Sequence, residues 1–141
     1  MSTRFLLSAL FFSATVSCTT LPEPKFQKHE FPEDAFVEDV KRPYTKVGTV
    51  RSKVNFPSLD FNRDENYLCR NYYNKAVRDL VKMAKKSGAD AVINVKSVVF
   101  LGDGRQESYS TPECADDGEE GQILTQGTAV KWTETEHSDQ N

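Results

Sequence analysis

Histidine is scarce in this sequence, and the residue patterns of common catalytic sites are missing. The two histidines, His29 and His137, both lie outside residues 45–133, where apolar residues recur with a regular period. This part therefore offers no imidazole as a general base, and the chain has neither a glycine-rich phosphate loop nor a nucleophile motif. The sequence does not predict an enzyme.

A strong excess of either charge is also missing. The 18 basic and 21 acidic residues give a formal net charge of −3. Domains whose main task is nucleic-acid binding carry a strongly basic surface. We therefore expect no nucleic-acid partner.

The most apolar run, at residues 5–12, is much shorter than the roughly 20 residues that a membrane-spanning helix needs. Arg4 precedes it, and the small residues Ser13, Ala14 and Ser17 lead from it to Cys18. This pattern predicts a secretory signal peptide at residues 1–17. It resembles the signal of bacterial lipoproteins, which implies that Cys18 becomes the N-terminus and carries a diacylglycerol. An ordinary cleaved signal, with Cys18 unmodified, is the alternative.

Residues 18–44 show no sustained helix or strand period and contain four of the six prolines. Proline fixes φ and lacks a backbone donor, so such a segment favours an extended linker. We predict a lipidated, flexible tether here. Its phenylalanines, Phe26, Phe31 and Phe36, are expected to touch the domain's own surface, with docking of a partner as the alternative.

The centre of the chain reads as one helix followed by one strand. Tyr73 and the apolar residues up to Ala84 recur at three- and four-residue spacing, which is typical of a helix with one buried face. Two lysines in the last turn and Gly88 after it predict that the helix ends at Ser87. Residues 91–99 then alternate in the manner of a half-buried strand.

Two further strands are predicted, at residues 46–50 and 122–132, where β-branched residues dominate. Gly127 in the last strand indicates a bulge or a close approach of another backbone. Residues 55–70 and 105–120 read as long loops, and residues 134–141 as a disordered tail. The fold class is therefore α+β: a small β-α-β-β domain at residues 45–133, with one helix packed on a three-stranded sheet.

Cys69 and Cys114 each belong to one of the two long loops. In an oxidising compartment the default outcome for such a pair is a disulfide, and it would stabilise a small domain substantially. A reactive thiol pair is the alternative, although the short Cys-x-x-Cys spacing that lowers a thiol pKa is missing.

Several short motifs occur in the order found in the RcsF family of outer-membrane lipoproteins. They are the lipoprotein signal, Gly48-Thr49-Val50, Cys69, the basic helix, Ala89 to Val92, Pro112-Glu113-Cys114 and Gly127-Thr128-Ala129. Over residues 47–132 the chain resembles that family, although RcsF proteins carry four cysteines in the domain and this chain has two. The helix-to-strand junction and the last strand are also similar to the YbjQ group of small proteins, sometimes labelled heavy-metal-binding.

The resemblance to RcsF implies a non-enzymatic protein, lipid-anchored in the bacterial cell envelope at the outer membrane. It implies contact with an envelope protein, and stress sensing or signalling as the form of that contact. The candidate contact surface is the helix stripe, the set of cations on the polar side of the helix: Lys75, Arg78, Lys82, Lys85 and Lys86. An ordinary solvated face is the alternative for this stripe.

The YbjQ likeness implies a metal-binding envelope module as the alternative function. The acidic loop, Glu113, Asp116, Asp117, Glu119 and Glu120, lacks the alternating aspartates of a calcium site. Soft-metal ligands are also scarce, since both histidines lie outside the domain. We therefore predict no metal site and no cofactor other than the lipid.

Overall fold

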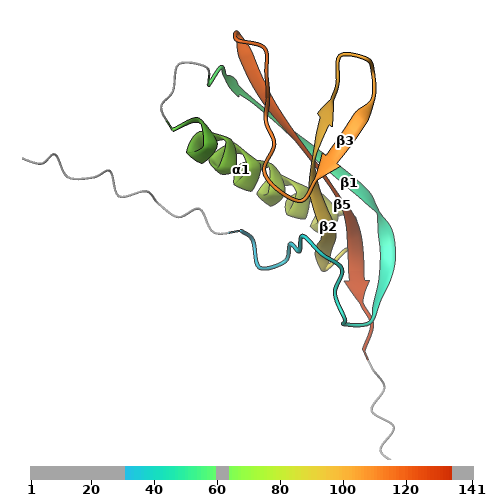
Figure 1. Cartoon of the computed structure of the whole chain (residues 1–141). Helices are drawn as coiled ribbons and strands as arrows, with labels where there is room; N and C mark the ends of the chain where they lie inside the picture. The colour runs from blue at the N-terminus through green and yellow to red at the C-terminus, as the bar shows by residue number, and fades with distance from the viewer. Residues whose placement is uncertain (1–30, 60–63, 135–141) are drawn as a thin grey trace, which may run out of the picture.

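One helix lies across one face of a five-stranded sheet in the computed structural model, which describes residues 31–59 and 64–134 (Figure 1). The elements follow in the order β1 (Tyr44–Pro57), α1 (Glu65–Lys86), β2 (Ala91–Phe100), β3 (Gln106–Tyr109), β4 (Ala115–Asp116) and β5 (Glu120–Trp132). The strand order is β1-β5-β2-β3, β4 pairs with β5, and every pair of these strands is antiparallel. The predicted α+β class is confirmed, but the sheet has five strands and not three.

The two extra strands lie in the stretch that reads as a polar loop. β3 folds back on the end of β2 through a turn in which Gly104 adopts a φ of 82°. β4 pairs with Gln122 and Gly121 of β5, beyond the point where β2 leaves β5. Both strands are short and polar, so they have no apolar alternation that the sequence pattern can reveal.

β1 and α1 are longer than the patterns indicated. β1 continues to Pro57, with Ser52, Val54 and Phe56 buried and the residues between them exposed. α1 begins at Glu65, ten residues before the basic stretch, because Cys69 and Tyr73 share its buried face. Its predicted end is confirmed.

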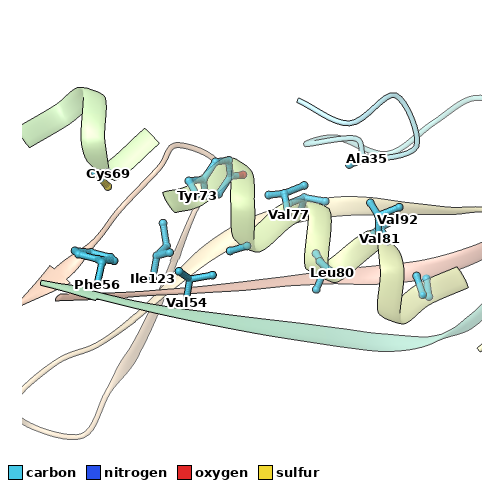
Figure 2. Packing of buried hydrophobic residues seen from close by; sticks show 14 of the residues in the cluster. Ala35, Val54, Phe56, Cys69, Tyr73, Val77, Leu80, Val81, Val92 and Ile123 are labelled. Atoms are coloured by element: carbon cyan, nitrogen blue, oxygen red, sulfur yellow. The ribbon is translucent and has the colours of Figure 1, made fainter. Parts of the chain in front are cut away.

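The core lies between α1 and the sheet. The helix contributes Tyr73, Ala76, Val77, Leu80, Val81 and Ala84, and the strands contribute Val54, Phe56, Val92, Val95, Ile123 and Ala129. Figure 2 shows Val54, Phe56 and Ile123 pointing from the strands toward the helix, and Leu80 pointing from the helix toward the strands. Gly127 lies opposite β2, where a Cβ would overlap Val92 and come within 3.2 Å of the Ile93 carbonyl oxygen. The predicted close approach at this glycine is confirmed.

Residues 31–44, which the sequence pattern assigned to the tether, pack on the domain. Phe36 donates its backbone N–H to Val92 of β2 at 2.9 Å, and Val95 donates to the Phe36 carbonyl at 3.0 Å. Phe31 stacks on Tyr73 of the helix, and Phe36 meets Trp132 edge-on. The segment closes the edge of β2 that β3 leaves unpaired, and so the packed region begins well before residue 45. The sequence pattern does not reveal this packing, because an irregular, proline-containing segment has no helix or strand period even when it packs on a domain.

Candidate partner-binding surfaces

A disulfide joins the two cysteines of the predicted pair. Cys69 lies in the second turn of α1 and Cys114 directly precedes β4, with their Cα atoms 5.9 Å apart. The bond therefore connects the helix layer to the sheet layer. Cys18, the predicted lipidation site, lies outside the described residues.

The lysines of the helix stripe are exposed and Arg78 is half-buried, and acidic side chains already neutralise part of the stripe. Lys82 forms an ion pair with Asp79 at 3.3 Å, as its helical spacing suggested. Lys85 forms another with Asp34 of the N-terminal segment at 2.5 Å. Lys75, Arg78 and Lys86 have no carboxylate within ion-pair distance among the described residues.

Two residues of the acidic loop serve the fold. Asp116 accepts hydrogen bonds from the backbone N–H of Leu59, the N–H of Gly118 and the Ser58 hydroxyl, and so fastens the residues that follow β1. The Leu59 bond is the largest of the effects that lower the pKa of the Asp116 carboxyl below its ordinary value. Asp117 accepts from the N–H groups of Glu120 and Glu119, which lower its pKa in the same way.

A metal site is not formed in the part of the chain that the structure describes. There, no group of three or more histidine, cysteine, aspartate or glutamate side chains is placed to hold an ion. His29 and His137 lie outside this part. Among the same residues, no helix is long and apolar enough to cross a membrane.

The second candidate surface is the face of the sheet that α1 does not cover, which we call the open face. In an antiparallel ladder, residues directly opposite each other point to the same side of the sheet. Arg51 is opposite Gln126, which is opposite Lys96, and Lys53 is opposite Leu124. Lys46 is opposite Val130, which belongs to the small apolar cluster on this same side. Lys46, Arg51, Lys53 and Lys96 therefore share the open face, whereas Lys131 of β5, opposite Thr45, points to the other side of the sheet.

The cations of the open face differ from those of the helix stripe in their surroundings. Lys46, Arg51, Lys53 and Lys96 are exposed, and none has a carboxylate within ion-pair distance among the described residues. Arg51 donates instead to the side-chain oxygen of Gln126 at 2.7 Å. Its positive charge, and those of the three lysines, remain available to an acidic partner.

Two adjoining hollows of about 250 and 220 Å³ lie on the same face, where β2 separates from β5. Both are lined by Lys53, Ala115 and Gln122. Val98 and Leu124 line the smaller one together with Phe100, whose side chain is 56% exposed. The larger hollow is also lined by Asp116, Asp117 and Glu120. The open face thus combines an accessible apolar patch with cations along β1 and β2 and with carboxylates at the β4 end.

The sequence patterns did not reveal this surface. Arg51 and Lys53 alternate with the buried Ser52 and Val54, which is the two-residue period of a half-buried strand. The predicted first strand ends at Val50, although this alternation continues beyond it. The helix stripe was conspicuous because its lysines and arginine are dense in sequence.

The comparisons with known proteins bear on the fold. No protein-family model and no curated protein matches the chain. The chain is similar to the crystal structure of a protein of unknown function from Pediococcus pentosaceus ATCC 25745, described as belonging to the DUF74 family. The TM-score is 0.51 and the identity 16%, over 70% of this chain and 96% of the other. This likeness shows a shared fold and nothing about function.

Proposed function

We propose that this chain is a lipid-anchored protein of the bacterial outer membrane whose disulfide-stapled domain contacts another envelope protein. The contact serves stress sensing or signalling, as the resemblance to RcsF implies. The observation that carries the proposal is the Cys69–Cys114 bond. Structural disulfides persist in oxidising compartments and are rare in the cytosol, which agrees with the signal pattern at residues 1–17.

Two features support contact as the task of the domain. The helix stripe and the open face both present cations to solvent, and the open face adds the exposed Phe100. Together with Val98 and Leu124, Phe100 forms an apolar patch with a polar rim, and such patches mark interaction sites. The cations imply that the partner's contact region is acidic.

The anchor is tested by expressing the full chain and its Cys18→Ala variant in a bacterium that has an outer membrane. We expect the parent chain to fractionate with the outer membrane and its N-terminal peptide to carry acyl chains by mass spectrometry. The variant should lose both properties. A parent chain found unacylated in the cytosol, with both remaining thiols free, would overturn the proposal.

The contact is tested by photo-crosslinking in living cells. A photoreactive residue replaces Asn55 on the open face in one strain and Lys75 on the helix stripe in another, both at exposed positions. We expect a discrete protein adduct from at least one of the two surfaces. Lack of an adduct from both surfaces, with the chain correctly anchored, would argue against protein contact as the function.

A further inference from the structure

The outer edge of β1 is an unpaired strand edge. β1 lies at the end of the strand order and pairs only with β5 among the described strands. Its 14 residues form the longest strand of the sheet (Figure 1). An edge of this length presents a row of unpaired N–H and C=O groups, which another extended chain can use.

The register identifies the residues whose backbone groups point outward. Ser58 donates its N–H to the Glu119 carbonyl at 3.4 Å, in register with the β1–β5 ladder. In an antiparallel ladder every second residue bonds to the same neighbour, so the even-numbered residues from 48 to 58 face β5. Thr49, Arg51, Lys53 and Asn55 therefore direct their backbone groups away from the sheet.

The charge of this edge is of one sign. β1 contains three cations, Lys46, Arg51 and Lys53, and no acidic residue. All three side chains lie on the open face, as shown above, and Arg51 and Lys53 belong to residues with outward backbone groups. A strand lying beside β1 would place alternate side chains next to these cations.

The other side of the same edge is apolar. Val50, Val54 and Phe56 lie on the helix side of the sheet and belong to the core or pack against it. Tyr72 of α1, partly buried, stacks on the Phe56 ring with the centroids 4.2 Å apart. The remaining side chains of an added strand would meet this rim of the core.

We propose that the outer edge of β1 binds an extended segment of a partner protein by strand addition, and that this segment alternates acidic with apolar residues. Its acidic side chains lie beside Arg51 and Lys53 on the open face, and its apolar side chains lie beside Val50 and Val54. This inference rests on the proposed function and specifies the chemistry of the partner.

The β1 strand of a second copy is an unfavourable occupant of this edge. Two β1 strands side by side would bring cations against cations, which is destabilising in a sheet. The register shift between Lys46 and Gly48 also interrupts the regular edge. Charges and bulges on edge strands oppose self-pairing, and they leave an oppositely charged strand as the favoured occupant.

The test uses the full chain, purified in detergent, and a short synthetic peptide in which glutamate alternates with valine and threonine. A peptide with lysine in place of glutamate is the matched probe. We expect the acidic peptide to bind and to slow amide hydrogen exchange at Thr49, Arg51, Lys53 and Asn55. The basic peptide should do neither. Binding should weaken with added salt, since exposed charges are screened.

Two charge-reversed variants distinguish the surfaces. The double variant Arg51→Glu, Lys53→Glu should lower affinity for the acidic peptide by about tenfold or more while keeping the melting temperature. The double variant Lys75→Glu, Lys86→Glu makes the same charge change on the helix stripe and should bind as the parent does. A larger loss from the helix variant would overturn the inference.

Other outcomes would also overturn it. They are protection of amides outside β1, equal binding of a single-stranded oligonucleotide, and a concentration-dependent dimer that Arg51→Glu, Lys53→Glu disrupts. Failure here is separable from failure of the proposed function. An acylated chain that crosslinks to an envelope protein, but whose β1 amides stay unprotected, would retain the function and lose the strand-addition site.

Discussion

The two faces of the sheet have different roles, although the same strands form both: one face packs against α1 and the other is exposed to solvent. On the covered face, Val54, Ile123 and Ala129 are buried under α1, and Gly127 has no room for a side chain. On the open face, Arg51 and Lys53 are exposed, and Lys53, Asn55 and Gln122 line a shallow groove. One strand thus supplies stability on one side and recognition on the other.

This separation follows from the two-residue period of a strand. Because successive side chains point to opposite faces, Arg51 and Lys53 can vary without disturbing Ser52 and Val54. The helix offers no such clean separation, since Lys82 and Lys85 are engaged with Asp79 and Asp34. We therefore expect substitutions on the covered face to change stability, and substitutions on the open face to change binding.

The largest effect should come from removing the bond that joins the two layers. Cys69 and Cys114 are 45 residues apart in sequence. Closing a loop of this size is worth about 3–4 kcal/mol in the chain-entropy account. The double variant Cys69→Ala, Cys114→Ala should lower the free energy of unfolding by about that amount in urea titrations. A loss below about 1 kcal/mol would mean that packing alone holds the helix on the sheet.

A matched leucine pair compares the faces directly. Leu80 is fully buried on the covered side, while Leu124 is half-buried on the open face. Leu80→Ala should cost about 3 kcal/mol, because it leaves a cavity as well as losing apolar burial. Leu124→Ala should cost about 1 kcal/mol or less. Equal losses would show that a further layer covers the open face in solution.

A matched threonine pair on β5 makes a finer comparison. The Thr125 hydroxyl is buried on the covered face and lacks a hydrogen-bond partner within the described residues. Thr125→Val should therefore raise the free energy of unfolding by about 1 kcal/mol. Thr128→Val, three residues along and half-buried, should change it by less than about 0.5 kcal/mol. A destabilising Thr125→Val would reveal a bound water or another partner for that hydroxyl.

Much of the covered face could be predicted from the sequence. Its elements have clear sequence patterns. Apolar residues recur at helical spacing up to Ala84, Gly88 with a φ of 83° follows the end of α1, and β2 alternates between buried and exposed residues. Gly127 also indicated a close contact, because a glycine inside a strand weakens the strand and often marks a place where another part of the chain leaves no room for a side chain. These elements have local patterns that reflect burial directly.

The structure of β3, β4 and the N-terminal segment could not be predicted in this way, because it depends on pairing with strands that are distant in sequence. β3 and β4 form through pairing with β2 and β5, and the N-terminal segment is held by the edge of β2. β3 and β4 are too short and polar to show a period, and the apolar residues of the N-terminal segment do not recur regularly because the segment is irregular. The open-face cations are dispersed in sequence between Lys46 and Lys96, and only the register brings them together.

The smallest effect should be a pH dependence at the rim of the groove. Asp116 accepts three hydrogen bonds as a carboxylate, which lower its folded-state pKa. A group with a depressed folded pKa stabilises the fold above its unfolded pKa, near pH 4, and this contribution is lost as pH falls through the folded pKa. Asp116→Asn should therefore be less stable than the parent at neutral pH, with a difference that shrinks in acid. Glu134→Gln, at an exposed position outside the helix and strands, is the control and should follow the parent. A pH-independent difference would mean that ionisation of Asp116 does not contribute to the stability of the fold.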